Sequence, residues 1–397
     1  MHFSFWTSFN KHMKKIKTTE REEKLLTQLT KGDRKIQKKR GFKSLTAFAA
    51  VICLVGVLAG CGVSLSRYQN QFLDVFDTAS TIIGYSKNED SFQKTYSDAH
   101  DLLLDCHRLY DIYNNYDGMN NLKTVNDNAG IAPVKVDQKI IDLVKFGKEV
   151  YEITDGKVNI AGGSVLSVWH DKREAGISDP EHAELPKDEE LKQAAKHTDI
   201  NNIIIDEANS TVYLSDPDMS LDVGGIAKGY SAELAAKQIM AEGNQSFCVN
   251  LGGNVRTIGT RADGKKWVIP IENPDYRDGD TNAEQYAVVT NLDGKSLVTS
   301  GDYERYYTVN GVRYSHLIDP DTLYPGTYHR SVSILTSDSG LADALSTGLF
   351  LMSVEDGKAC LSKLNADRPQ DDQIEACWID ADGTMTYTDG FKNYIEK

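Results

Sequence analysis

SLDVGGIAKGYSAELAAKQI, residues 220–239, joins a short apolar run to a helical pattern through a pair of glycines. The run Met219–Val223 predicts a strand, and the apolar residues from Ile226 onward predict a helix. Gly224 and Gly225 would let the backbone approach a ligand closely, because neither carries a Cβ. The stretch therefore predicts a strand that enters a helix through a ligand-binding loop.

The beginning of this predicted helix suits a phosphate group. A helix N-terminus offers free N–H donors and a partial positive charge, and Lys228 adds a full charge in the first turn. The chain lacks the GxxxxGK[ST] pattern of a P-loop and the GxGxxG pattern of a dinucleotide-binding fold. A glycine-rich corner with a solvated lysine is the alternative, and these residues alone leave both interpretations open.

The charge of the chain is unevenly distributed. Residues 1–43 carry 13 Lys and Arg against 4 Asp and Glu, whereas all 397 residues together carry a net charge of −14. The remainder is therefore strongly acidic and would repel a polyanion, which argues against binding of nucleic acid. Cys106, Cys248, Cys360 and Cys377 are scattered without CxxC spacing, so they do not indicate a zinc site.

Helical and strand patterns alternate along the rest of the chain. Apolar residues at helical spacing predict helices within 90–113, 138–154, 341–352 and 354–364. Strands are predicted within 73–86, 201–216 and 306–320, and Asn310-Gly311 suits a type I′ hairpin turn. Because hairpins dominate, we expect an α+β fold, a single large domain with mixed or antiparallel sheets and flanking helices, rather than a doubly wound parallel sheet.

Two further segments carry residues suited to chemistry. In GLADALSTGLF, Asp343 and Thr347 are four residues apart, so a helix places both on one face. Their oxygens are ligands that Mg²⁺ prefers, although a helix cap and a neutral filler would give the same pattern. In YSHLIDP, His316 lies at the end of a hairpin, where it could transfer a proton beside a flat ring, although a lone histidine is more often structural.

The order of these motifs is more specific than any one of them. LDVGGIAKGY, VNLGGNV, TSGDYERY, SHLIDP and ADALSTGLF follow one another along the chain, and the succession resembles the FAD:protein FMN transferase (ApbE) family from about Phe76 to the C-terminus. The segment GKVNIAGGSVLSVW matches a further family run in its position and its final Trp. It departs from the family pattern at Asn159, Ala161 and Ser164, which puts the flavin contacts of this segment in question.

The resemblance implies a function and a set of site residues. Members of the family bind FAD and Mg²⁺, transfer FMN to a Ser or Thr hydroxyl of a partner flavoprotein and release AMP. By motif, the backbone carbonyl of Gly225 would join Asp343 and Thr347 as Mg²⁺ ligands. The residues that would contact FAD are Phe76, Tyr116, Val158, Asn159, Asp222, Lys228 and Ile318, where Tyr116 fits the motif slightly better than Tyr113. Either His316 or Asp343 is expected to act as the catalytic base.

The N-terminal part of the chain resembles a lipoprotein signal. The apolar run that ends in LAGC resembles a bacterial lipobox, in which Cys61 would be lipidated. An uncleaved membrane anchor with an incidental cysteine is the alternative. We therefore expect a leader and signal at 1–60, a linker at 61–72 and a flavin transferase domain at 73–397. The body would be extracytoplasmic, lipid-anchored to the cell membrane and partnered by a membrane-bound or extracytoplasmic flavoprotein.

Two other functions fit the same residues. Water could replace the acceptor hydroxyl, which would make the protein an FAD pyrophosphatase that forms FMN and AMP. Alternatively, a lipoprotein of another functional class could hold FAD without turning it over.

Overall fold

The computed structural model describes residues 64–396, which lie within one compact unit, Val63–Lys397. The leader, the signal segment and Cys61 lie outside the described residues. An eight-stranded sheet forms the frame, and every neighbouring pair of strands in it is antiparallel. Its order is β1 (Ser66–Phe72), β2 (Ser80–Ser86), β6 (Phe247–Leu251), β7 (Asn254–Ile258), β10 (Ser296–Gly301), β13 (His329–Thr336), β14 (Glu375–Asp380) and β15 (Met385–Tyr387).

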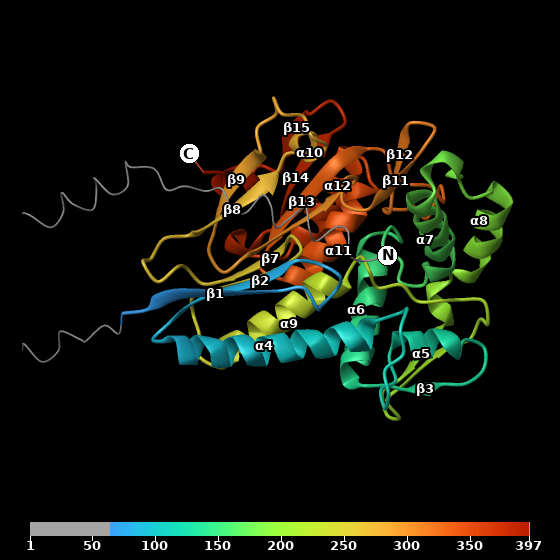
Figure 1. The fold of residues 1–397 in the computed structure, drawn as a ribbon, viewed down its shortest axis with the longest axis horizontal. Helices are drawn as coiled ribbons and strands as arrows, with labels where there is room; N and C mark the ends of the chain where they lie inside the picture. Colours follow the sequence, from blue (N-terminus) through green and yellow to red (C-terminus); the bar gives the residue numbers. More distant parts are fainter. Residues whose placement is uncertain (1–63, 397) are drawn as a thin grey trace, which may run out of the picture. The chain divides into compact units, whose positions relative to one another are not determined.

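Four helices cover one face of this sheet: α4 (Glu89–Tyr110), α9 (Ala227–Ala241), α11 (Ser339–Phe350) and α12 (Val354–Asn365). Figure 1 shows α4 and α9 side by side beneath β1 and β2. The helices bury apolar stripes against the inward side chains of the strands, as in the cluster that joins Phe92 of α4, Ala235 of α9 and Ile82 of β2. The α+β class that the sequence predicted is confirmed, and α4, α9, α11 and α12 are all helices that it predicted.

A second layer of elements lies beside the N-terminal end of α9 (Figure 1). It consists of α5 (Leu122–Asp127), β3 (Val134–Lys135), α6 (Gln138–Ile153), α7 (Gly163–Ser178), α8 (Asp188–Ala194), β4 (Ile203–Asp206) and β5 (Thr211–Leu214). The short strands form a three-stranded sheet in the order β3-β5-β4. Its hydrophobic core continues into α9, because Ile226 and Ala227 are buried within it.

Two hairpins complete the fold. One pairs β8 (Trp267–Glu272) with β9 (Tyr286–Leu292), and the short helix α10 (Pro274–Arg277) lies in the connection between these strands. The other pairs β11 (Tyr306–Val309) with β12 (Val312–Ser315). Asn310 and Gly311 both have positive φ, 52° and 81°, as the predicted type I′ turn requires.

Two local predictions were wrong. The predicted linker at 61–72 is a strand from Ser66 onward, since β1 pairs with β2 along its whole length. The run Met219–Val223 is not a strand. Leu221 exchanges both of its backbone hydrogen bonds with the Asn126 side-chain amide, at 2.7 and 3.0 Å, while Ser220 and Asp222 bond to the backbone of Gly163 and Ile160 at 3.1 and 2.9 Å.

No helix among the described residues is both long and apolar enough to cross a membrane.

Candidate active site

A cavity of about 1220 Å³ opens between the N-terminal end of α9, the hairpins and the second layer. Gly224, Gly225 and Lys228 line it. The loop is shaped by Asp222, whose carboxylate accepts the N–H of Gly224 at 2.7 Å. The N-cap residue Ile226 makes no side-chain capping hydrogen bond, and the first turn of α9 lies at the cavity, which Ala227 and Lys228 line. The phosphate-suited loop that the sequence predicted thus faces a cavity rather than bulk solvent.

Asp343 reaches this loop because α9 and α11 pack closely. A Cβ on Gly229 would lie 2.2 Å from the Ser339 carbonyl oxygen and 2.4 Å from Asp343 Cβ, so only glycine fits between the helices. The Gly229 N–H donates to Asp343 Oδ2 at 2.7 Å. Asp343 is 3% exposed, and burial raises its pKa, which the nearby Lys228 charge and the Gly229 N–H oppose.

The three residues proposed as metal ligands converge at this point. A Cβ on Gly225 would lie 3.5 Å from Thr347 Oγ1, so the glycine backbone lies directly against the threonine side chain. Asp343 and Thr347 share one face of α11, and the Thr347 hydroxyl lies 3.4 Å from Ser300 Oγ. A carboxylate, a hydroxyl and a backbone carbonyl around one space are a donor set that fits Mg²⁺.

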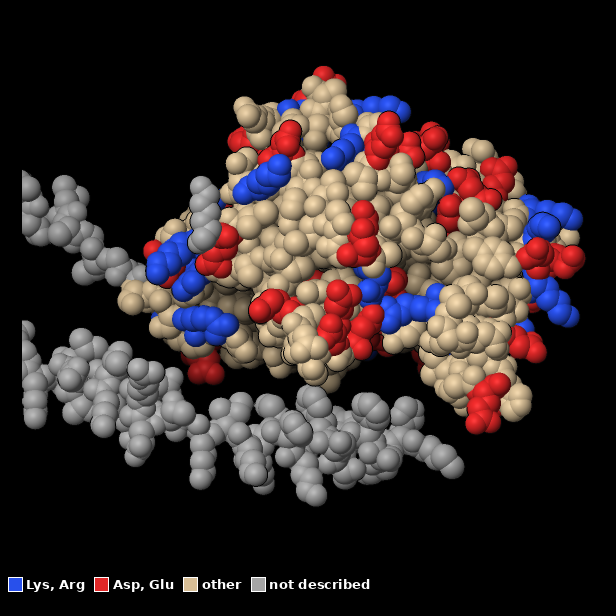
Figure 2. Space-filling view, turned by 90° about the horizontal axis from the view of Figure 1, so that it is seen from above, with Lys and Arg blue, Asp and Glu red and all other residues tan. Residues whose placement is uncertain are grey.

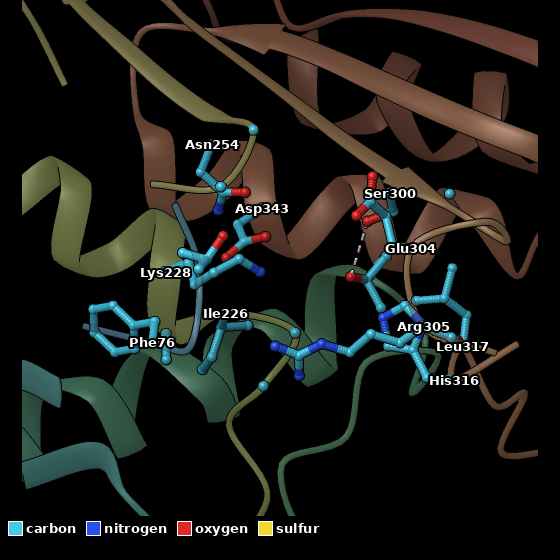
Figure 3. Close-up of a pocket in the computed structure, with 18 of the residues that line it drawn as sticks. Phe76, Ile226, Lys228, Asn254, Ser300, Glu304, Arg305, His316, Leu317 and Asp343 are labelled. Carbon is cyan, nitrogen blue, oxygen red and sulfur yellow. Dashed lines mark hydrogen bonds between the residues drawn. The ribbon is translucent and has the colours of Figure 1, made fainter. Parts of the chain in front are cut away.

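Asn254 is a member of this cluster that sequence reasoning missed. It is 2% exposed, and its side-chain amide is close enough to the Asp343 carboxylate to oppose the rise in the pKa of that group. Figure 3 shows Asn254 beside Asp343, facing the same cavity. The only sequence signal was the VNLGGNV motif, in which the second glycine pair, Gly252-Gly253, directly precedes Asn254.

His316 lines the cavity near Arg305 (Figure 3). Its Nδ1 lies 3.1 Å from the Arg305 carbonyl oxygen. Because a carbonyl can only accept, Nδ1 carries the proton and Nε2 keeps its lone pair in the neutral ring. Burial, helped by the positive charges of Arg305, Lys228 and Arg173, lowers the pKa of His316 to about 3. The imidazole is therefore neutral at physiological pH and can accept a proton.

The cavity has an excess of cations near Asp222. Burial raises the pKa of Asp222, and the Gly224 N–H, His170, Arg305 and Arg173 oppose this shift. Neither Arg173 nor Arg305 was predicted as a site residue, although Arg305 lies within the TSGDYERY motif. In Figure 2, Lys and Arg side chains gather at a hollow in the surface with Asp and Glu side chains beside it. Such an arrangement attracts an anionic ligand.

An ion-pair network holds the turn that carries Arg305. Arg330 binds both carboxylate oxygens of Asp302 through its Nε, at 3.0 and 3.1 Å, and Asp278 joins Arg330 to Arg313. These pairs are partly buried and connect β13, the β11–β12 hairpin and the end of α10. The network fixes the turn that carries Arg305 into the cavity.

Most of the remaining residues that were predicted to contact FAD line one part of the cavity, the aromatic arm, whose walls are rich in rings. Phe76, Val158, Asn159 and Ile318 all line the cavity. Further rings in its wall come from His107, Tyr110, Tyr113, Trp169, His170, Tyr307 and Tyr314. Flat rings stack favourably on such side chains, so this arm suits a flavin or an adenine.

Tyr116 is not part of the cavity wall. Its hydroxyl donates to Asp111 Oδ2 at 2.8 Å, whereas Tyr113 of the same segment lines the cavity, with its ring 5.3 Å from that of His170. The sequence favoured Tyr116 because it fits the motif slightly better, but its hydrogen bond to Asp111 holds that side chain away from the cavity wall.

Asn159, one of the departures from the family pattern, is held firmly. Its side chain donates to the Thr198 carbonyl and accepts the Ala161 N–H, both at 2.9 Å. Lys157, two residues earlier, bridges Asp319 and Asp321 at 2.8 and 2.7 Å. The segment that carries Val158 and Asn159 is thereby tied to the turn that carries Ile318.

A family model described as the ApbE family matches residues 76–370. The chain belongs to this family. Among curated proteins, it is 32% identical to a FAD:protein FMN transferase of Klebsiella pneumoniae over 60% of this chain and 70% of the relative. It is 30% identical to a FAD:protein FMN transferase of Vibrio cholerae over 69% of this chain and 75% of the relative.

The fold agrees with a solved structure of the same family. The crystal structure of the ApbE protein of Thermotoga maritima superposes with a TM-score of 0.71 at 27% identity, and the match covers 84% of this chain and all of that chain. The ApbE resemblance that the sequence motifs indicated is therefore confirmed.

Proposed function

We propose that this protein is a Mg²⁺-dependent FAD:protein FMN transferase, which moves FMN from FAD onto a Ser or Thr hydroxyl of a partner flavoprotein and releases AMP. The family and its named relatives support flavin transfer from FAD to protein. The observation that carries the finer proposal is the convergence of Gly225, Asp343 and Thr347 beside Lys228 in one cavity with an aromatic arm. The magnesium requirement and the hydroxyl acceptor are the proposed elements.

In this proposal, Gly225, Asp343 and Thr347 hold Mg²⁺, which would withdraw charge from the pyrophosphate oxygens when bound. Lys228 and the N-terminal end of α9 position the same pyrophosphate. The acceptor oxygen forms a bond to the FMN phosphorus, and the bond from that phosphorus to the AMP oxygen breaks. AMP leaves with the bonding electron pair, and the hydroxyl proton goes to a base of the protein.

His316 is the better candidate for that base. It is neutral, and its Nε2 is free to accept a proton. Asp343 is committed in this proposal to the metal and to the Gly229 N–H. The dianionic pyrophosphate would offset the cations around His316 when FAD binds, which raises the pKa of the imidazole and makes it a stronger base.

One experiment separates the proposal from its two alternatives. The purified protein is incubated with FAD and Mg²⁺, with and without a candidate flavoprotein acceptor, and AMP, free FMN and protein-bound FMN are measured. Transfer predicts acceptor-bound FMN and AMP in equal amounts, and loss of both with EDTA. Free FMN formed at the same rate without the acceptor would instead indicate a pyrophosphatase. FAD binding that survives EDTA, without AMP, would indicate a binding protein.

We also propose that Cys61 is lipidated and anchors the protein to the outer side of the cell membrane. The LAGC sequence at the end of an apolar run supports this localisation. A Cys61→Ser variant tests it, because loss of the lipid should move the protein from the membrane fraction to the soluble fraction after expression in bacteria. A variant that stays in the membrane fraction would favour the uncleaved anchor.

A further inference from the structure

The contact between α9 and α11 is repeated one helical turn away from the reaction centre. In the first contact, Asp343 of α11 accepts the Gly229 N–H of α9 at 2.7 Å. In the second contact, Glu233 of α9 accepts the Ser339 N–H of α11 at 3.0 Å. Residues four apart lie on one face of a helix, so both contacts belong to the same antiparallel interface. Each helix therefore supplies one carboxylate to a backbone N–H of the other.

Strand β7 contributes a polar side chain to each of these contacts. Asn254 lies beside Asp343 (Figure 3). Arg256 Nε donates to Glu233 Oε2 at 2.8 Å, and we call Glu233 and Arg256 the rear ion pair. Alternate residues of a strand point to the same face of the sheet, so both side chains of β7 point toward the helices. The same three elements thus form the reaction centre and, one turn behind it, the rear ion pair.

The rear ion pair is buried away from the cavity. Glu233 and Arg256 are each 6% exposed, and neither lines the cavity. Taking two charges out of water costs free energy that good geometry and further hydrogen bonds must offset. Arg256 Nη1 makes two of these bonds, to the carbonyl oxygens of Thr257 and Gly294 at 2.6 and 2.8 Å. Apolar residues of similar volume often stabilise a fold as well as a buried ion pair does, so stability alone does not account for these charges.

Arg256 also connects the rear ion pair to β10, because Gly294 lies in the turn before that strand. Farther along β10, Ser300 Oγ lies 3.4 Å from Thr347 Oγ1. The rear ion pair therefore contacts α9, α11, β7 and the turn that begins β10. These four elements carry residues around the proposed metal site, namely Lys228, Asn254, Ser300, Asp343 and Thr347.

A shift between these elements would change the geometry around a bound metal ion. Mg²⁺ demands near-ideal octahedral geometry, and its proposed ligands come from two segments, Gly225 before α9 and Asp343 and Thr347 on α11. Ser339 is the first residue of α11, so its N–H has no partner within that helix and Glu233 satisfies it. Glu233 thereby fixes the first turn of α11, one turn before Asp343. The position of Asp343 relative to α9 therefore depends on Glu233.

We propose that Glu233 and Arg256 are positioning residues, which act through α11 and β7 to hold Asp343 and Asn254 in the geometry that binds the metal. This inference rests on the proposed Mg²⁺-dependent function and adds two residues outside the cavity on which metal affinity depends. Neither residue contacts FAD, the metal or the acceptor in this proposal.

Glu233→Gln tests the proposal, because its amide oxygen can still accept the Ser339 N–H while the charge that binds Arg256 is lost. Metal affinity is measured without turnover, from the EPR signal of free Mn²⁺ titrated with protein in the presence of FAD and the absence of an acceptor. We expect Mn²⁺ binding to weaken about tenfold or more, as is typical when a residue that orients a metal ligand is changed. The Mg²⁺ concentration for half-maximal flavinylation should rise by a similar factor. Flavinylation at saturating Mg²⁺ should recover, because no group at the reaction centre is removed.

Arg256→Lys is a milder variant of the same pair. Lysine keeps the positive charge, but its single ammonium group cannot reach Glu233 and two carbonyl oxygens together. We expect a smaller loss of Mn²⁺ affinity in the same direction. This variant decides the question if Glu233→Gln does not fold.

Two controls separate positioning from general stability. Lys237→Gln removes an exposed charge 3.7 Å from Glu233 and should bind Mn²⁺ as the wild type does. Phe391→Leu weakens a buried cluster that contains no residue of α9, α11 or β7. It should lower the thermal midpoint and leave Mn²⁺ affinity unchanged.

Two results would overturn the proposal. One is a Mn²⁺ affinity within about twofold of wild type in every folded variant of the rear ion pair, well short of the usual loss. The other is a loss of Mn²⁺ affinity in Phe391→Leu as large as in Glu233→Gln, which would assign the effect to general destabilisation. Wild-type transfer that does not respond to Mg²⁺ would refute the proposed function itself, and this inference with it.

Discussion

Asp343 is the residue on which the proposed chemistry depends most. It is buried, one carboxylate oxygen is occupied by the Gly229 N–H, and the other is available to a cation. Asp343→Asn keeps the shape and the capacity to accept that N–H but removes the charge. We expect transfer to fall by about 10²–10³-fold, the typical loss when one transition-state-stabilising group is removed. Steady-state flavinylation measures this, and circular dichroism confirms the fold. Activity within about threefold of wild type would exclude Asp343 as a metal ligand.

His316 makes a pH prediction whose sign follows from its environment. Its pKa is about 3 in the folded protein and about 6.5 in the unfolded chain, so the unfolded state binds more protons between these values. Stability contributed by the neutral ring is therefore present above pH 6.5 and is lost as the pH falls toward 3. His316→Gln cannot titrate, so between pH 8 and pH 5 the urea midpoint of the wild type should fall more than that of the variant. Parallel midpoints would contradict the lowered pKa.

At the scale of elements, the contact between α9 and α11 sets the geometry of the site. Gly229→Ala would place a methyl group against the Ser339 carbonyl and force the helices apart. We expect it to lower the free energy of unfolding by about 1–3 kcal/mol, the usual cost of overpacking, although alanine is the better helix former. Transfer activity should fall as well, because Asp343 moves with α11. Met240→Ala on the exposed side of α9 is the control and should stay within about 0.5 kcal/mol. Urea denaturation measures the free energy of unfolding of both variants. Equal values would mean that α9 and α11 can move apart at no cost.

The same scale shows what sequence patterns can predict. Helices α4, α6 and α12 were predictable because each buries one stripe of its own residues, whereas α11 is buried on nearly every side and was recognisable from its apolar run. β1 was not predictable, because it has few apolar side chains and is identified as a strand only by its pairing with β2. Leu221 and its neighbours were misassigned because one distant amide, Asn126, replaces a partner strand. Within the site, Asp343, Thr347 and Lys228 stood out by spacing, whereas Asn254 and Arg305 acquire their roles only from contacts between distant segments.

For the whole molecule, the cavity is the space that elements from all parts of the fold share. Its walls come from both layers and both hairpins, so a ligand that fills it should stabilise the complete unit. We expect FAD and Mg²⁺ together to raise the thermal midpoint, since binding at 100 times Kd contributes about 2.7 kcal/mol. FAD with EDTA should give a smaller shift, as should Mg²⁺ alone. Equal shifts with and without the metal would indicate that FAD binds independently of Gly225, Asp343 and Thr347.

The order of strands in the main sheet has a consequence for synthesis and folding. β2 pairs with β6, yet α4, α9 and the entire second layer lie between them in the chain. β10, β13, β14 and β15, by contrast, are neighbours in an order close to that of the sequence. Contacts over long sequence separations form slowly, so we expect the C-terminal strands to assemble first and the β1–β2 pair to dock onto β6 afterwards. Because α11 follows β13, a nascent chain that has emerged only as far as β13 still lacks Asp343.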